Sequence, residues 1–194
     1  WFLDLSPNAQ VPVLITENGV ALFESDAIVE YINEVSQPLE QGLTPEQKAL
    51  DRAWSYMAAK HYLVQCSAMR SADESTFCER MSKLSKPFEK AENMLTNGPF
   101  FKGDSLSDVD IAWLPLLHRA QIIEQHTGFD LFANKPKVKH WQKELASSGL
   151  YEASVDVDFE PAFVNFYLSQ ETYLGQGANG CVTQKNDCAT AACC

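Results

Sequence analysis

The sequence predicts a small α/β segment followed by a larger all-helical domain. Near the start of the chain, two short β-branched, apolar runs flank an Asn-Gly pair, which is typical of a hairpin. From Thr44 to about Leu168, apolar residues recur at helical spacing. The chain has 194 residues, of which 45% are hydrophobic and 21% charged. This is a globular composition, sufficient for one domain or two small ones.

Residues 11–23 are predicted to form the hairpin. Its strands would contain Val13–Ile15 and Val20–Phe23, with Asn18 and Gly19 in the turn, since both residues tolerate positive φ. A helix is then expected to begin at Ser25 or a neighbour and to end before Pro38. It is indicated by one apolar face, formed by Ala27, Ile28, Tyr31, Ile32 and Val35.

The helical part is predicted to begin at Thr44, with Pro45 in the first helical position and Gln47 completing a capping box. Its apolar face would contain Leu50, Trp54, Met57, Ala58 and His61. A second helix is expected at about 75–95, kinked or interrupted at Pro87. Two more are expected at about 108–125 and 137–147.

Charge and hydropathy argue against two classes of partner. Fifteen basic residues stand against 26 acidic ones, a net charge of -11, with no basic stripe for a nucleic acid or an anionic membrane. No apolar run approaches the ~20 residues that span a bilayer, and no secretory signal opens the chain. We therefore expect neither nucleic acid nor membrane as a partner.

Two segments in the first part of the chain indicate a binding site. Pro12 stands at a strand entry, and a cis bond there would expose the backbone N–H and C=O of Val11. Glu24 and Ser25 stand where a strand ends and a helix begins, so free N–H groups and a hydroxyl could hold a carboxylate. The Glu24 carboxylate suits an ammonium group. Together they fit a ligand with an amino-acid head and a peptide-like body. The alternative interpretation makes Pro12 a turn residue and Ser25 an N-cap.

The segments Ser6-Pro7-Asn8-Ala9-Gln10-Val11-Pro12-Val13-Leu14 and Glu24-Ser25-Asp26-Ala27-Ile28 resemble motifs of the glutathione S-transferase family. The resemblance covers the chain to about Leu168. It implies an α/β thioredoxin-like domain over 1–36, lacking its N-terminal strand–helix–strand in the printed sequence, and a linker over 37–44. An all-helical bundle domain would follow over 45–168, and then a cysteine-containing, mobile tail over 169–194.

The resemblance also implies roles for individual residues. Val11, beside a cis Pro12, would pair its backbone with the cysteinyl part of glutathione. Glu24 and Ser25 would hold the γ-glutamyl end, and Gln10 would lie near the glycyl end. The catalytic Tyr, Ser or Cys is expected upstream of Trp1, so the printed chain by itself is expected to be inactive.

The implied protein is a cytoplasmic, homodimeric glutathione transferase that acts in detoxification. It would use glutathione as co-substrate, with no metal and no nucleotide, and would promote attack of the thiolate on a small apolar electrophile. Two alternatives stay open. One is a Cys-type glutathione-dependent thiol transferase, and the other is a non-catalytic binding or assembly module of the same fold.

Three further features have competing interpretations. Ser107 and Asp110 fit a capping box better than a catalytic acid. An aromatic and methionine stripe could line the acceptor-substrate pocket or simply be helix core; its members are Trp54, Met57, His61 and Trp113. Four cysteines near the C-terminus could be free thiols or, with less support from their spacing, metal or redox groups; these are Cys181, Cys188, Cys193 and Cys194.

Overall fold

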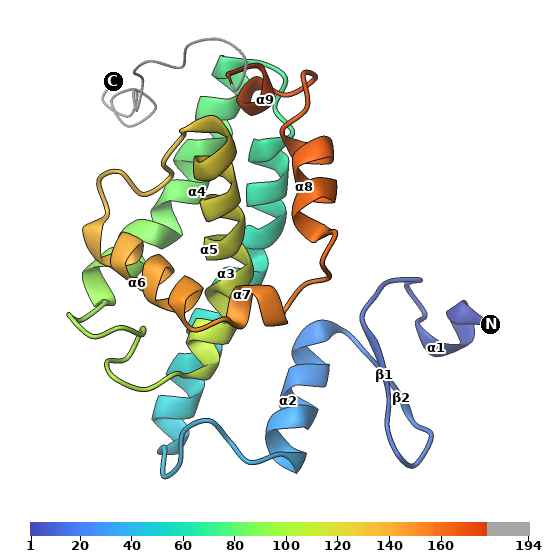
Figure 1. The fold of residues 1–194 in the computed structure, drawn as a ribbon. Coiled ribbons are helices and arrows are strands. Elements are labelled where there is room, and N and C mark those ends of the chain that lie inside the picture. Colours follow the sequence, from blue (N-terminus) through green and yellow to red (C-terminus); the bar gives the residue numbers. More distant parts are fainter. Residues whose placement is uncertain (178–194) are drawn as a thin grey trace. The chain divides into compact units, whose positions relative to one another are not determined.

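A computed structural model describes residues 1–177, which form two compact units divided between Leu43 and Thr44 (Figure 1). We call them unit 1 and unit 2. The division falls at the end of the linker predicted for 37–44. The predictions for Cys181, Cys188, Cys193 and Cys194 lie outside the described residues.

Unit 1 is built on a two-stranded antiparallel sheet with helices before and after it. Its elements are α1 (Phe2–Leu5), β1 (Val13–Ile15), β2 (Ala21–Phe23) and α2 (Ser25–Val35). The strands pair Val13 with Phe23 and Ile15 with Ala21, so the predicted hairpin is confirmed. Helix α1 has no counterpart among the predicted elements.

The hairpin turn differs from the prediction in its backbone conformation. The N–H of Gly19 donates to the carbonyl of Thr16 at 2.9 Å, and the N–H of Thr16 donates to the carbonyl of Val20 at 2.9 Å. Gly19 has φ 77°, whereas Asn18 does not have a positive φ. A turn followed by a single left-handed glycine is the bulged hairpin, which needs only one residue at positive φ. Glycine therefore carries the conformational demand here.

Helix α2 begins at Ser25, and Glu24 rather than Ser25 is its N-cap residue. Ile28 is buried, and the apolar face continues with Tyr31, which is half-buried. Farther along the same face, Ile32 is 43% exposed and Val35 is 63% exposed. The predicted apolar face is thus only partly covered in the described chain.

Unit 2 consists of helices (Figure 1). They are α3 (Pro45–Met69), α4 (Glu74–Met94), α5 (Asp108–Thr127), α6 (Pro136–Ser147), α7 (Leu150–Ala153), α8 (Phe159–Tyr167) and α9 (Tyr173–Gly177). The Thr44–Gln47 capping box at the start of α3 is confirmed. Helix α4 continues through Pro87, so of the two predicted effects the interruption is absent and the kink stays a prediction. Leu50, predicted on the apolar face of α3, is 62% exposed.

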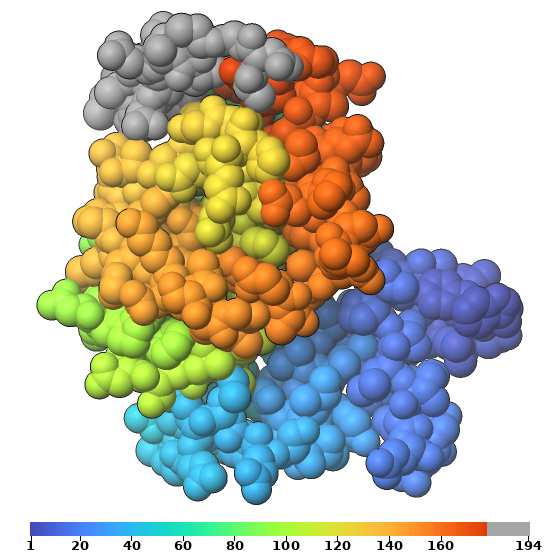
Figure 2. Space-filling view, viewed as in Figure 1, coloured from blue at the N-terminus to red at the C-terminus, as the bar shows by residue number. Residues whose placement is uncertain are grey.

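Two groups of buried side chains hold unit 2 together. The main core is formed by side chains of the four helices α3, α4, α5 and α6. It contains Ala58, Leu84, Phe88, Ala91, Val109, Trp113, Leu117, Val138, Trp141 and Leu145. The second core joins α3, α4 and α5 to the last two helices and contains Met69, Phe77, Ile122, Ile123, Phe163, Leu168 and Leu174. In the space-filling view, the α5 and α6 regions, yellow and orange, adjoin at the surface of unit 2 (Figure 2).

The described part of the predicted tail, residues 169–177, is packed rather than mobile. Leu174 is buried in the second core, and Thr172 is buried beside it. The N–H of Tyr173 donates to the carbonyl of Ser71 at 2.7 Å, and the Tyr173 ring packs on Phe77. The segment lacks clear apolar periodicity because only a few of its side chains make these contacts.

Asp110 connects the first turn of α5 to its surroundings. The carboxylate is fully buried and accepts four hydrogen bonds, two from the Ser107 N–H and hydroxyl and two from the Phe101 N–H and the Trp141 indole. The distances are 2.6–2.8 Å. The capping interpretation therefore accounts for this carboxylate, and the catalytic one does not.

Two buried glutamines, one on α3 and one on α6, donate hydrogen bonds to backbone carbonyls of helix α5. Gln65 of α3 donates its amide N–H to the carbonyl of Leu116 at 2.9 Å. Gln142 of α6 donates to the next carbonyl, that of Leu117, also at 2.9 Å.

None of the helices in residues 1–177 combines the length and the hydropathy of a membrane-spanning segment.

Candidate functional site

The first part of the candidate site is the segment before β1. The Val11–Pro12 peptide bond is cis, and Val11 is 80% exposed. Within residues 1–177, neither the N–H nor the C=O of Val11 has a hydrogen-bond partner. The backbone of Val11 therefore presents a donor and an acceptor that a peptide-like ligand can pair with.

The second part of the site is the junction of β2 and α2. Because Val13 pairs with Phe23, the chain leaves both strands at the same end of the hairpin, toward Pro12 on one side and Glu24 on the other. Glu24 has φ 67° and ψ 116°. A non-glycine residue in this region costs about 1–3 kcal/mol, and such strain is typical of functional sites.

The N-terminus of helix α2 contributes backbone N–H groups that have no partner within the helix. Its first intrahelical bond runs from the N–H of Ile28 to the carbonyl of Glu24 at 3.0 Å. The N–H groups of Ser25, Asp26 and Ala27 precede that bond, so the helix does not use them. The exposed Ser25 hydroxyl lies at the same end. This combination favours a carboxylate, although Asp26 brings a negative charge into the same turn.

A short loop orders the residues between α1 and the cis bond. Ser6 is buried; its hydroxyl donates to the carbonyl of Gln10 at 2.9 Å and accepts from the Gln10 N–H at 3.1 Å. The loop also brings the Asn8 amide within 3.3 Å of the Glu24 carboxylate, to which it donates. Asn8 carried no prediction, since its relation to Glu24 depends on strand pairing rather than on a local motif.

The structure sorts the predicted acceptor-pocket residues into two kinds. Trp113 is fully buried in the main core, and its indole donates to the carbonyl of Trp54 at 3.0 Å. The prediction that Trp113 lines an open pocket is therefore wrong, because its ring has no accessible surface. Trp54 and Met57 are half-buried against the main core, and the half-buried His61 ring contacts the carbonyl of Met57 at 2.7 Å. For these three residues, the pocket assignment stays a prediction.

A polar group in an otherwise apolar part of α5 was missed at the sequence level. Arg119 lies over the rings of Tyr62 and Phe159, at 4.9 and 5.4 Å from their centres. Its guanidinium donates to the carbonyl of Pro115 at 2.9 Å and to the Tyr62 hydroxyl at 3.3 Å. No carboxylate pairs with it in the part of the chain that the structure describes. The only sequence signal was a His-Arg pair inside an apolar helix.

Phenol and imidazole groups surround this arginine. Burial, with the neighbouring Cys66 and Tyr62, raises the pKa of Tyr167 to about 12 despite the opposing charge of Arg119. Burial, reinforced by the charge of Arg119, lowers the pKa of His118, whose ring stacks on Tyr151 at 4.5 Å. Both groups are neutral near pH 7, so Arg119 supplies the positive charge of this cluster.

Among residues 1–177, no three His, Cys, Asp or Glu side chains come together as metal ligands. The chemistry available in unit 1 is thus backbone pairing at Val11, one carboxylate and one helix start. Groups of these kinds are suited to the charged head and the amide of a small peptide. By its fold, the chain joins part of a thioredoxin-like α/β domain to an all-helical domain.

Comparisons with known proteins agree with this architecture. A family model described as "Glutathione S-transferase, N-terminal domain" matches residues 1–35, and one described as "Glutathione S-transferase, C-terminal domain" matches residues 72–156. The chain is 29% identical over 176 residues to a protein of Sus scrofa named "Glutathione S-transferase omega-1", covering 87% of this chain and 70% of that protein. The chain belongs to the glutathione S-transferase family.

Solved structures show the same fold. Glutathione transferase Omega 3C from Trametes versicolor aligns with a TM-score of 0.69 and 21% identity, over 88% of this chain and 74% of that one. A glutathione S-transferase from Methylobacillus flagellatus, solved with GSH bound, aligns with a TM-score of 0.65 and 20% identity. That alignment covers 80% of each chain.

Proposed function

We propose that the protein is a glutathione transferase, which binds glutathione through unit 1 and promotes attack of its thiolate on a small apolar electrophile. The observation that carries the proposal is the exposed backbone of Val11 beside the cis bond, at the same end of the hairpin as the strained Glu24. Residues held in strained backbone conformations cluster at functional sites, which favours a binding role over a purely structural one. Membership of the family and the GSH bound to the Methylobacillus relative support the choice of ligand.

Each part of the tripeptide is assigned a partner. The Val11 backbone pairs with the cysteinyl amide and carbonyl, as an added strand would. The Glu24 carboxylate binds the γ-glutamyl ammonium, and Ser25 with the start of α2 binds the γ-glutamyl carboxylate. Gln10 is assigned to the glycyl end. Asn8, through its bond to Glu24 at 3.3 Å, holds that carboxylate in place.

We further propose that unit 2 binds the electrophile near the exposed side of α3. Trp54, Met57 and His61 supply apolar and aromatic surface there. The unpaired Arg119 and its ring partner Tyr62 add a cation for electrophiles that carry a carboxylate or an aromatic group. No metal or nucleotide has a part in this scheme.

The catalytic group decides between two reactions. A Tyr or Ser donor would stabilise the thiolate for conjugation. A Cys thiolate would instead attack the disulfide between glutathione and a substrate thiol, release that thiol and become joined to glutathione, and a second glutathione would then free it as glutathione disulfide. We assign this role to no residue within 1–177. Steady-state assays of the protein as expressed in its cell, with an aromatic halide and with a mixed disulfide as alternative substrates, distinguish conjugation from thiol transfer.

Glutathione binding tests the proposal directly, by calorimetric titration of the protein and of three variants. We expect Glu24→Gln to weaken binding by about tenfold, since a charge-assisted bond to the ammonium is lost. Ser25→Ala should weaken it by a smaller factor. The matched control is Glu17→Gln, an exposed carboxylate at the turn end of the hairpin, which should bind like the parent. Absence of glutathione binding by both the parent and Glu24→Gln would favour the non-catalytic module, whereas equal measurable affinity would remove Glu24 from the site.

We also propose that the protein is a cytoplasmic homodimer with a role in detoxification. The support for self-association is the exposed apolar surface of α2, where Val29, Ile32 and Val35 are 50%, 43% and 63% exposed. Sedimentation equilibrium of the parent and of Ile32→Glu tests this. A partner over α2 predicts a dimer that the added charge dissociates, whereas a monomeric parent would refute the assignment.

A further inference from the structure

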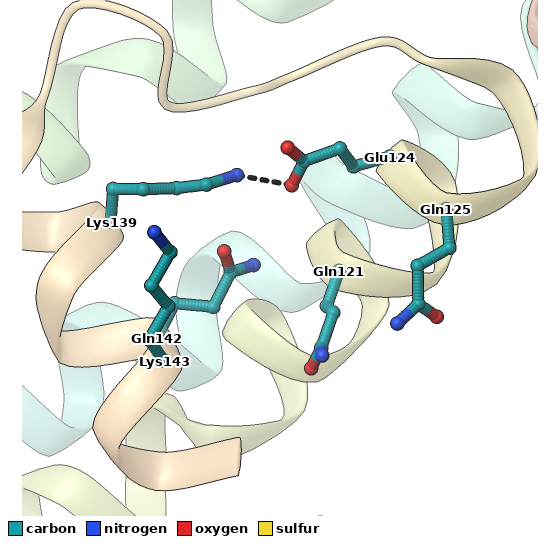
Figure 3. Close-up of a pocket in the computed structure, with 6 residues that line it drawn as sticks. All are labelled: Gln121, Glu124, Gln125, Lys139, Gln142 and Lys143. Atoms are coloured by element: carbon teal, nitrogen blue, oxygen red, sulfur yellow. Dashed lines mark hydrogen bonds and ion pairs between the residues drawn. The ribbon is translucent and has the colours of Figure 1, made fainter. Parts of the chain in front are cut away.

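A cavity of about 370 Å³ lies between helices α5 and α6 (Figure 3). It belongs to unit 2 and uses no residue of the proposed glutathione or electrophile sites. Its volume is at the lower end of the range for small-molecule pockets. Its lining consists of Gln121, Glu124, Gln125, Lys139, Gln142 and Lys143.

The two helices are bridged across the cavity by an ion pair. Lys139 of α6 bonds to the carboxylate of Glu124 of α5, as the dashed line in Figure 3 shows. Lys139 also bonds to Asp130 at 3.0 Å. Lys139 is thus paired with two carboxylates, and the Glu124 carboxylate is paired with Lys139.

The second lysine is different. In residues 1–177, Lys143 has no carboxylate within ion-pair distance, and its side chain is exposed. Figure 3 shows it rising from α6 beside Lys139 and Gln142. The net charge of -11 on the chain opposes anions in general, so the attraction at this cavity comes from the unpaired Lys143 ammonium alone.

The cavity also contains a fixed amide. Gln142 is only 3% exposed, and its amide N–H group is held by the Leu117 carbonyl at 2.9 Å. Within the described chain, its oxygen accepts no hydrogen bond, and Figure 3 shows the Gln142 amide among the side chains that line the cavity. The amides of Gln121 and Gln125 add donors and acceptors from α5.

We propose that this cavity binds a small carboxylic acid that also carries an amide group, such as an N-acylated amino acid. The carboxylate pairs with the Lys143 ammonium, and the ligand amide N–H donates to the Gln142 oxygen. The Gln121 and Gln125 side chains satisfy the remaining polar atoms. Uncharged amides lack the ion pair and bind more weakly.

The probe is N-acetylglycine, titrated into ¹⁵N-labelled protein with assigned backbone resonances, and N-acetylglycinamide is the neutral analogue. We expect saturable shifts at 121–125 and 139–143, with an affinity about tenfold weaker for the neutral analogue. Lys143→Met should weaken binding of the acid to the same extent. Lys90→Met, which removes an exposed lysine from α4, is the matched control and should bind like the parent.

Three results would overturn the proposal. They are the absence of saturable shifts in these two segments, equal binding of the acid and its amide, and equal affinity of Lys143→Met and Lys90→Met. Shifts confined to residues 10–25 would locate the acid in the proposed glutathione site instead. Because Lys143 lies outside that site, Lys143→Met should retain the parent's glutathione affinity, so failure of one proposal leaves the other testable.

Discussion

Replacing Asp110 by alanine is expected to destabilise unit 2 strongly. The carboxylate is fully buried and accepts from two backbone N–H groups, one hydroxyl and one indole. Ser107 can turn its hydroxyl elsewhere, but the two backbone donors and the Trp141 indole stay where the fold places them. Each buried donor left unpaired costs about 1–3 kcal/mol, so the three together predict a loss of at least about 3 kcal/mol.

That loss is large against the 5–15 kcal/mol that typically stabilises a folded protein. Urea denaturation, followed through the fluorescence of the buried tryptophans, measures it. Asp110→Asn keeps an acceptor for Phe101 and Trp141 but turns an amide N–H toward Ser107, so an intermediate loss of about 2 kcal/mol is expected. The exposed Asp104→Ala is the control, within about 0.5 kcal/mol of the parent. If Asp110→Ala came within 1 kcal/mol of the parent, the four bonds would not be holding α5.

Two further predictions concern the end of unit 2. Gly175→Ala would place a Cβ 2.0 Å from the carbonyl oxygen of Ser169. We therefore expect a lower melting temperature and a free energy of unfolding reduced by about 1–3 kcal/mol. An unchanged melting temperature would show that α9 packs differently. Tyr167, with a pKa of about 12 against an ordinary 10.0, should ionise late in a spectrophotometric titration, read as the difference between the parent and Tyr167→Phe. Since folding favours the protonated phenol, the stability that it contributes should fall as pH rises from about 10 toward 12, and ionisation near 10 would contradict the proposed surroundings.

The hairpin, α2 and the four long helices could be predicted because each has a strong local signal. The Asn-Gly turn, the Thr44 capping box and the helical spacing in α5 all act within a few residues. The packing of 169–177 could not be predicted in this way. That segment is held by Ser71 and Phe77, about a hundred residues earlier in the chain, and nothing in its own periodicity encodes these contacts.

In the candidate site, too, features with a local sequence signal could be predicted, and features that depend on contacts distant in the sequence could not. Pro12 and Glu24 could be predicted as candidates because a proline before a strand and an acidic residue before a helix have recognisable local chemistry. The cis bond at Pro12 is confirmed, and the binding roles stay a prediction. Asn8 was missed because its hydrogen bond to Glu24 depends on the register of β1 and β2. Trp113 was misjudged because an aromatic residue at helical spacing looks the same whether its ring is accessible or, as here, sealed in the core.

The two glutamine side chains that donate to carbonyls of α5 limit how the packing of the helices can change. Gln65 and Gln142 reach successive carbonyls, those of Leu116 and Leu117, from α3 and α6. Sliding α5 along its axis by a single residue, about 1.5 Å, would break both bonds at once. Three neighbouring helices are thereby locked in longitudinal alignment. Evolution can exchange one aliphatic side chain for another around α5 without losing that alignment, but it cannot shift the helix by one position unless both amides are replaced together.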